Sequence, residues 1–143
     1  MNPFQKLFYY IAWVGIAGAI TIILILTYWF VAPYNVVTFQ GDNAKLVETT
    51  VKSGGYLQIK QDYCKKMALP ARVSCEFIDG LTYSVPVYNS DRDLGCAKRI
   101  EFKYVPKALS AGNYKLQCVY SYRVNPLRTV EYTLVTGIFT ITK

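Results

Sequence analysis

Histidine is absent from the 143-residue sequence. Without an imidazole, the chain cannot form histidine metal sites, histidine general bases or the common catalytic triads. It also lacks a glycine-rich phosphate loop, a nucleophile motif and any Asn-x-Ser/Thr acceptor for N-glycosylation. We therefore expect the protein not to be an enzyme and to need no metal or other cofactor.

Charged residues are missing between Lys6 and Asp42, and residues 9–31 within this gap are predominantly apolar. A helix over that stretch measures about 35 Å, enough to cross the hydrocarbon core of a bilayer. Aromatic side chains gather at both ends, as in the interfacial belt of a membrane span. They are Tyr9, Tyr10, Trp13, Tyr28, Trp29 and Tyr34. The sequence predicts a single-pass transmembrane helix, with the lipid bilayer as a partner.

The span fits an uncleaved anchor better than a signal peptide. Its apolar run exceeds the roughly 7–15 residues of a signal sequence, and Pro33 follows the nearest cleavage pattern at residues 30–32. Lys6 before the span gives a small positive-inside bias, and all four cysteines follow the span. We expect a cytoplasmic N-terminus and an extracytoplasmic head, at a bacterial inner membrane or a virion membrane.

Small residues lie together in the span, with Gly15 and Ala19 on one face and Gly18 beside them. Such residues permit close packing of two helices, so self-association through the helix is one alternative. Small residues are also common in spans that do not associate. The sequence leaves both alternatives open.

The chain after the span is long enough for one small domain. We expect residues 1–33 to form the tail and helix, 34–45 a linker and 46–143 the head. Alternating polarity and turn signals predict strands at 46–51, 56–63, 72–78, 81–87, 99–105, 114–124 and 129–142. Strands in this number and spacing predict an all-β head, an antiparallel β-sandwich.

Five of these strands, 56–63, 72–78, 99–105, 114–124 and 129–142, have an apolar phase that can be assigned. In 114–124 the expected inward residues are Tyr114, Leu116, Cys118, Tyr120 and Tyr122. In 99–105 the expected inward residues are Ile100, Phe102 and Tyr104, with Arg99, Glu101 and Lys103 facing outward. In 129–142 the phase shifts partway, which indicates a bulge at Gly137.

The stretch 107–118 is similar to the turn into the F strand of immunoglobulin-like domains. Gly112, Tyr114 and Cys118 supply the Gly, Tyr and Cys that recur at this turn. The resemblance implies an immunoglobulin-like β-sandwich behind the transmembrane helix, with Tyr114 forming a corner.

Four cysteines in the head suit an oxidising compartment. Cys75 and Cys118 face the core from strands that are neighbours in an immunoglobulin-like sheet, and Cys64 and Cys96 lie at strand ends. We therefore expect structural disulfides joining Cys75 to Cys118 and Cys64 to Cys96. The alternative of redox or zinc chemistry needs close pairs such as Cys-x-x-Cys, and the sequence has none.

A further set of motifs extends over nearly the whole chain. Besides the span, it comprises Asp62-Tyr63-Cys64, Gly95-Cys96, Gly112-Asn113-Tyr114 and the stretch 124–131. Together they resemble small uncharacterised single-span membrane proteins encoded by tailed bacteriophages. That family has no established activity, so the resemblance implies no catalytic residue.

Basic residues predominate in the head, because all but one of the 16 Lys and Arg follow the span, against 9 Asp and Glu. They are scattered, which predicts a solvated basic surface and no specific nucleic-acid partner. Binding residues concentrate in loops. We expect partner contacts at Arg92 in the polar loop 89–95, and at Leu127 and Arg128 in the hairpin tip 125–128.

These features predict a membrane-anchored extracytoplasmic interaction module. It would hold a protein partner of unknown identity at the membrane, and at the host envelope if it is phage-encoded. The alternative is a structural subunit of a larger membrane assembly or of a lipid-containing virion. Co-purification in a fixed stoichiometry would favour the subunit, whereas a module should work as an isolated span and head.

Overall fold

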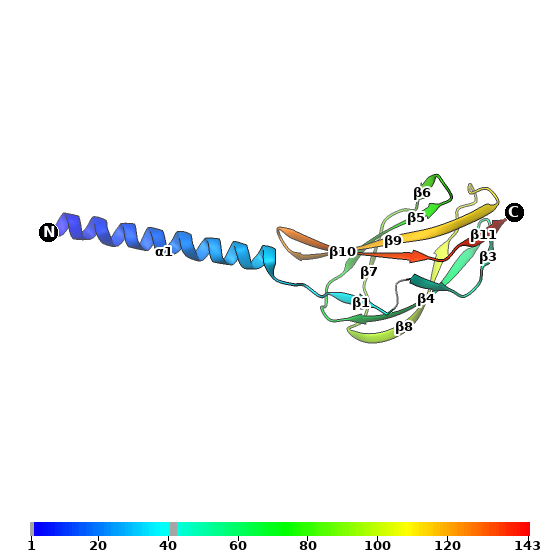
Figure 1. Ribbon diagram of the computed structural model, residues 1–143, viewed down its shortest axis with the longest axis horizontal. Helices are drawn as coiled ribbons and strands as arrows, with labels where there is room; N and C mark the ends of the chain where they lie inside the picture. The colour runs from blue at the N-terminus through cyan, green and yellow to red at the C-terminus, as the bar shows by residue number, and fades with distance from the viewer. Residues whose placement is uncertain (1, 41–42) are drawn as a thin grey trace. The chain divides into compact units, whose positions relative to one another are not determined.

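The computed structural model describes residues 2–40 and 43–143, apart from the side chain of residue 43. One helix precedes a series of strands that make up about half of the chain, and Figure 1 labels all of them except β2. The residues divide into two compact units, Met1–Pro33 with Asn125–Arg128, and Tyr34–Val124 with Thr129–Lys143.

Helix α1 (Pro3–Val31) is bounded by prolines. Pro3 occupies the first helical turn, where a missing N–H costs nothing, and the backbone N–H of Asn2 donates to Gln5 Oε1 at 3.1 Å. Pro33 cannot continue the helix, because its ring clashes with the preceding turn. The chain therefore limits α1 to the apolar run and a short flank on its N-terminal side.

The surface of α1 is apolar around its whole circumference, and the protein buries none of its described residues. Two hydroxyls within the run have partners inside the helix. Thr21 and Thr27 donate to the carbonyl oxygens of Ala17 and Ile23 at 2.9 and 2.7 Å. A hydroxyl that is satisfied in this way costs less in hydrocarbon. By length and composition, α1 can span a membrane.

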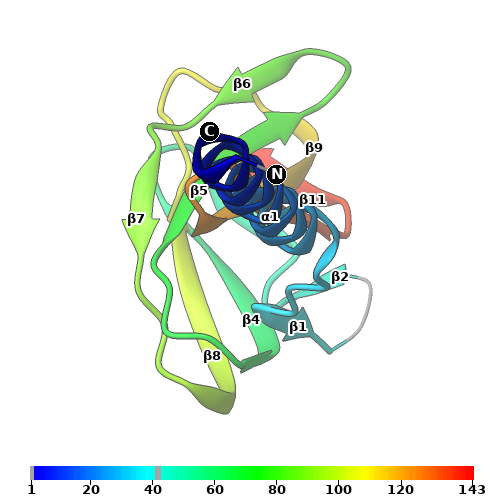
Figure 2. The ribbon, with the colours of Figure 1, turned by 90° about the vertical axis from the view of Figure 1, so that its left-hand side faces the viewer.

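The head is made of short and long strands in two layers. The strands are β1 (Val37–Phe39), β2 (Asn43–Leu46), β3 (Thr50–Lys52), β4 (Tyr56–Lys65), β5 (Ala71–Ile78), β6 (Thr82–Ser84), β7 (Tyr88–Ser90), β8 (Gly95–Tyr104), β9 (Gly112–Asn125), β10 (Arg128–Thr136) and β11 (Phe139–Thr142). In one layer, β4 pairs with β1, β2 and β8. In the other, β5 pairs with β6, β7 and β9 (Figure 2). Strand β9 also neighbours β10 and β11.

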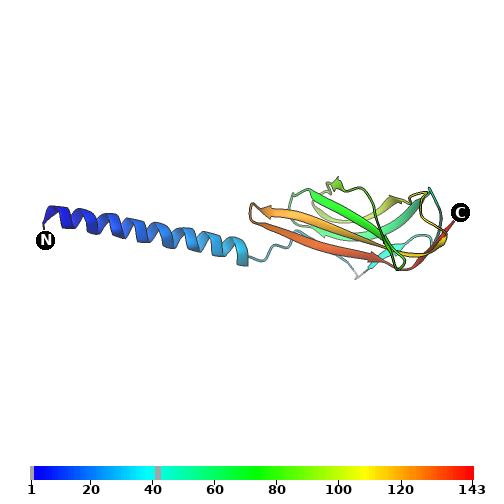
Figure 3. The same cartoon turned by 90° about the horizontal axis from the view of Figure 1, so that it is seen from above.

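The sheet is mixed, so the expectation of a purely antiparallel sandwich was wrong. Strand β2 runs parallel to β10, and β3 runs parallel to β11. Hairpin signals reveal only strands that are close in sequence, such as β9 and β10, which run in opposite directions in Figure 3. The parallel pairs join the first strands of the head to the last ones, and no turn signal reports such a pairing.

The segment expected to be a linker, residues 34–45, belongs largely to the head. Val36 and Val37 are fully buried and Ala44 is nearly so. Val36 also donates its backbone N–H to the Tyr132 hydroxyl at 3.2 Å. Because these apolar side chains complete the core, only residues near Pro33 are left to connect the helix to the head.

One buried cluster unites both layers, and β9 supplies much of it. Its five expected inward residues, Tyr114, Leu116, Cys118, Tyr120 and Tyr122, are all at most 3% exposed. At Gly137, where a bulge within a single strand was expected, the chain instead leaves β10 and begins β11, and Phe139 and Ile141 resume the core beyond it. The apolar phase read from these strands is confirmed.

In β8 the side chains expected to face inward face outward, and those expected to face outward face inward. Ile100, Phe102 and Tyr104 are 48%, 62% and 44% exposed, whereas Lys103 is buried and Glu101 is half-buried. The register with β4 explains the reversal, because Glu101 and Lys103 lie opposite two buried residues of β4, Ile59 and Leu57. Opposite residues in an antiparallel pair share a face, so the charged set faces inward.

Candidate functional site

An open groove lies between β8 and β5, bordered by β7, with a volume of about 460 Å³. Its floor is core, because the lining residues Cys75, Phe77 and Leu116 are at most 2% exposed. Its walls carry polar and charged groups that include Tyr88, Arg99, Glu101 and Lys103. An apolar floor with a few convergent polar groups is the usual character of a binding site.

The strand arrangement explains why the groove is open. Strand β8 has ten residues, but among the strands that the structure describes it pairs only with β4. Across the groove, β6 and β7 have three residues each and pair with opposite ends of β5. No described strand continues the β4–β8 layer beyond β8, so the inner faces of β5 and β8 are left partly uncovered.

The Glu101 carboxylate is the centre of charge in the groove wall. Its Oε2 lies 2.8 Å from Lys103 Nζ, and its Oε1 accepts from the Arg92 guanidinium. Lys103 also donates to the Tyr88 hydroxyl. Burial acts to raise the pKa of Glu101, but the Lys103 and Arg92 cations outweigh it, so the pKa is lowered. Glu101 is therefore ionised at neutral pH.

Arg92 lies inside the head, so the expectation that it contacts a partner was wrong. Its side chain is 1% exposed. Its Nη2 donates to Gln61 Oε1 at 2.6 Å and to the Tyr120 hydroxyl at 3.0 Å. The guanidinium also stacks among three rings, with Cζ 4.7 Å from the centroids of Tyr63 and Tyr120 and 5.3 Å from that of Phe39. Buried cations need such partners.

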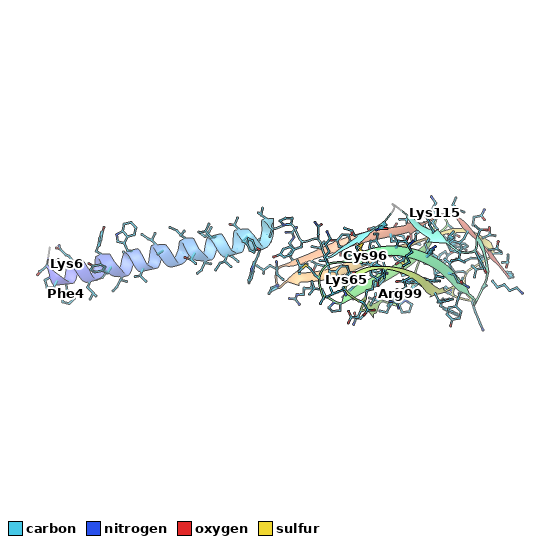
Figure 4. The ribbon with its side chains drawn as sticks, turned by 90° about the horizontal axis from the view of Figure 1, so that it is seen from below. Phe4, Lys6, Lys65, Cys96, Arg99 and Lys115 are labelled. Carbon is cyan, nitrogen blue, oxygen red and sulfur yellow. A yellow bond between two sulfur atoms is a disulfide. The ribbon has the colours of Figure 1, made fainter. Side chains whose placement is uncertain are left out.

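The loop that carries Arg92 is fastened by a second buried cation. Lys65 Nζ donates to the Arg92 carbonyl oxygen at 2.6 Å and to Asp91 Oδ1 at 3.3 Å. Lys65 lies near the end of β4, the strand beside β8 (Figure 4). These bonds explain how a polar loop can direct an arginine into the core.

The Tyr120 hydroxyl joins the same network from β9. It accepts from Gln61 Nε2 at 3.2 Å and donates to Glu101 Oε2 at 3.3 Å. Burial and the neighbouring Glu101 carboxylate raise the pKa of Tyr120 far above its ordinary value. The network thus joins the Tyr120 phenol and the Glu101 carboxylate to Arg92 and Lys103, and these bonds fix the side chains of the groove wall.

Both disulfides join the cysteine pairs expected from the sequence. Cys75 and Cys118 are opposite each other in β5 and β9 and are buried. Cys64 and Cys96 are opposite each other in β4 and β8, on the outer face of that layer. Cys75 contributes to the groove floor, so one bridge supports the site directly.

The hairpin tip presents Leu127, which is 51% exposed, and its role in partner contact stays a prediction. Within its own compact unit, Arg128 donates to the carbonyl oxygens of Phe30 and Ala32 at 2.7 and 2.8 Å. Carbonyls at a helix C-terminus lack partners in the helix, and a basic side chain satisfies them well. Arg128 therefore has a structural contact that the sequence did not suggest.

The small residues of the span stay exposed. A methyl group added at Gly15 or at Gly18 would meet nothing within 4 Å, and Ala19 is exposed too. Helix self-association stays a prediction. Among residues 2–40 and 43–143, no group of three His, Cys, Asp or Glu side chains is placed to hold a metal ion.

Sequence reasoning missed the groove and its residues Glu101 and Lys103. One signal was available: strand 99–105 alternates charged and apolar residues with equal regularity, so either set fits the inward face. The polar residues around Arg92 predict an exposed loop, and not a loop that directs its arginine into the core. A buried arginine has no local sequence signature, because its partners come from β4, β8 and β9.

Comparisons with known proteins add no family. No protein-family model matches the sequence, and no curated protein matches it. Among solved structures, the chain is similar to the Pseudomonas fluorescens alkylpurine DNA glycosylase AlkC bound to DNA containing an abasic site analog. The identity is 7% and the TM-score 0.32, and the match covers 69% of this chain and 30% of that chain. A likeness this weak carries no argument about fold or activity.

Proposed function

We propose that the protein is a membrane-anchored extracytoplasmic interaction module that binds a protein segment in the groove between β8 and β5. The groove carries this proposal. It has a volume of about 460 Å³, an apolar floor and charged walls. An extended segment with alternate apolar side chains could fill the floor, and an acidic group on it would face Arg99 and Lys103.

We also propose that the head is immunoglobulin-like. Two features, one of strand pairing and one of side-chain hydrogen bonding, support this assignment. In one layer β1, β4 and β8 are neighbours, and in the other β5, β9 and β10 are, in the manner of the A-B-E and C-F-G strands. The Tyr114 hydroxyl donates to the Ser110 carbonyl oxygen at 3.1 Å, as a tyrosine corner does.

The setting we propose is the envelope of a bacterium infected by a tailed phage, and the resemblance of the motifs to phage membrane proteins supports it. The second candidate function is that of a structural subunit in a membrane assembly or virion. The uncovered small residues of α1 favour this alternative, because a subunit would pack its span against others.

Protease accessibility tests the proposed orientation. If the N-terminus is cytoplasmic, protease added to intact spheroplasts that express the chain should remove the head and leave the span. Immunoblotting with tags at each end of the chain would report both fragments. Complete protection of the head, with loss of the N-terminal tag, would contradict the orientation.

Blocking the groove should reduce partner capture. Ser90 lines the groove and is half-buried, so Ser90→Trp places an indole in the space that the partner segment needs. In a detergent pull-down from the native source, we expect Ser90→Trp to lower specific capture at least about tenfold, equivalent to about 1.4 kcal/mol. Quantitative mass spectrometry of the captured proteins would measure the change.

The matched control is Thr133→Trp, which adds the same indole to an exposed position on β10. It should leave capture unchanged, and both variants should keep the urea midpoint of the wild type. Equal capture by Ser90→Trp and wild type would remove the groove from the binding surface. Reduced capture by Leu127→Ala with Arg128→Ala would then assign binding to the hairpin tip.

A further inference from the structure

Among the strands that the structure describes, none pairs with the outer edge of β8. Backbone hydrogen bonds show which residues direct their N–H and C=O groups toward that edge. Gln58 and Asp62 of β4 accept from Val47 and Gln40 through their carbonyl oxygens, on the side of β4 away from β8. Backbone N–H and C=O of one residue in a strand point the same way. Gln58 and Asp62 therefore form no ladder bonds with β8.

The residues of β8 opposite Gln58 and Asp62 are Phe102 and Lys98. In an antiparallel pair, residues that exchange bonds alternate with residues that do not. Val105 confirms the alternation, because it exchanges bonds of 2.9 and 3.0 Å with the β4 side of the chain at Gly55 and Gly54. Lys98, Ile100, Phe102 and Tyr104 consequently direct their backbone groups away from β4, where no described strand pairs with them.

The side chains along this edge have an unusual distribution. The outer face is apolar for the length of Ile100, Phe102 and Tyr104, which are 44–62% exposed. The inner face carries one exposed cation, Arg99, two positions before the Glu101 carboxylate (Figure 4). A long edge with apolar side chains is a template for another strand unless something protects it.

A second copy of β8 would match this edge in one register. If two copies run antiparallel about a two-fold axis through Ile100, the two Ile100 side chains meet on the outer face. Arg99 then lies opposite the partner's Glu101, and Lys98 lies opposite the partner's Phe102. Residues that direct their backbone groups outward face each other, so the ladder bonds form in both directions.

The neighbouring registers are unfavourable. An axis through Arg99 sets two arginines directly opposite each other. An axis through Glu101 sets two carboxylates opposite each other, and it also places Arg99 opposite the partner's Lys103. Like charges directly opposite destabilise a strand pair, and axes further from the middle of β8 shorten the ladder. The charge pattern selects the axis through Ile100.

We infer that the protein forms a homodimer in which β8 (Gly95–Tyr104) pairs with β8 of a second copy about a two-fold axis through Ile100. Glu101 is already bonded to Arg92 and Lys103, so the partner's Arg99 serves mainly to exclude the other registers. The backbone ladder and the Ile100 contact provide the attraction. This inference goes beyond the proposed binding function, although it uses residues 99–104 of β8, which also line the groove.

Cysteine substitution at the axis tests the inference on the full chain in detergent micelles. Bonded residues in an antiparallel pair have Cα atoms about 5.5 Å apart, which is within disulfide range. Under mild oxidation, Ile100→Cys should yield a covalent dimer through the introduced thiols. Lys98→Cys and Phe102→Cys should each stay monomeric alone, because neither position meets itself, but a mixture of the two should crosslink.

Two further variants separate the strand contact from other causes. Arg99→Glu in the Ile100→Cys background should slow crosslinking at least about tenfold, since it places the introduced carboxylate opposite the partner's Glu101. Gly15→Leu with Gly18→Leu, which would block close helix packing, should leave crosslinking intact. Peptide mapping should show the Cys64–Cys96 bridge unchanged in every variant.

The inference is overturned if Ile100→Cys stays monomeric, or if Lys98→Cys alone crosslinks as fast. It is also overturned if the glycine variant abolishes crosslinking, because the contact would then depend on the span. A monomer would mean that Lys98 and Arg99 keep the edge free of other strands. Loss of partner capture by Ser90→Trp alongside a monomer would still support the proposed function, so the two ideas fail separately.

Discussion

Glu101→Ala should lower the free energy of unfolding of the head by about 3–5 kcal/mol, the usual cost of leaving a buried charge unpaired. The carboxylate neutralises Arg92 and Lys103, whose side chains are 1% and 10% exposed. Removing it leaves both cations in a region with little water. Urea denaturation in detergent micelles, followed by circular dichroism of the strands, would measure the loss.

The control is Glu131→Ala, which removes an exposed carboxylate bonded to Ser121 at 2.9 Å. A surface contact of this kind contributes about 0–1 kcal/mol. Replacing the group as a whole, with Arg92→Met, Glu101→Leu and Lys103→Met, should recover much of the loss, because no charge is then left unpaired. Equal stability of Glu101→Ala and Glu131→Ala would contradict the structural role of the network.

The lowered pKa of Glu101 also predicts acid sensitivity. A carboxyl whose pKa is lower in the folded state contributes stability that is present above its unfolded pKa, near 4.3. That contribution disappears as the pH falls through the folded pKa. The urea midpoint should therefore fall on acidification below about pH 4, and it should fall less in Glu101→Ala than in Glu131→Ala.

Removing the buried bridge should have an effect of similar size. Cys75 and Cys118 are separated by 43 residues, and closing such a loop stabilises a fold by about 4 kcal/mol in the chain-entropy model. Cys75→Ala with Cys118→Ala should lose that contribution and also leave small voids beneath the groove. Thermal and urea unfolding of the purified double variant would report the loss.

The second bridge provides the comparison. Cys64 and Cys96 are separated by 32 residues, so loop entropy alone predicts nearly the same loss for Cys64→Ala with Cys96→Ala. This pair is less buried than Cys75 and Cys118, so little packing is lost with it. The buried pair should therefore be the more costly to remove. A larger loss for Cys64→Ala with Cys96→Ala would mean that the Cys64–Cys96 bridge stabilises the pairing of β8 with β4 more than the buried bridge stabilises the core.

The contrast between β9 and β8 shows what the sequence could predict. In β9 every inward residue is apolar or aromatic and the outward ones are mostly polar, so the alternation has one solution. In β8 the apolar and charged sets alternate equally well, and the choice depends on Arg92 in the preceding loop, whose other partners come from β4 and β9. A shift of one residue in the pairing register of a strand moves all of its inward side chains to the other face. The local sequence of β8 does not show which register the strand adopts.

The candidate site was largely outside the reach of sequence reasoning for the same reason. The cysteine pairs could be predicted, because they depend on strand order and facing. The groove depends on the absence of a described strand beside β8, and on β6 and β7 being short. The 81–87 stretch, expected to be one return strand, is shortened to β6, with Pro86 following it. Proline removes the donor that a longer strand would need.

The two disulfides have a mechanical consequence for the head. Each one fastens strands within a single layer, β4 to β8 and β5 to β9. In the immunoglobulin domains of antibodies, by contrast, a disulfide joins the two sheets to each other. Among the described residues, no disulfide joins the two sheets. Packing, the pairing of β2 with β10 and side-chain hydrogen bonds such as that of Lys103 to Tyr88 hold them together. We therefore expect the groove to widen for a bulky segment by breaking non-covalent contacts alone, without any reducing agent.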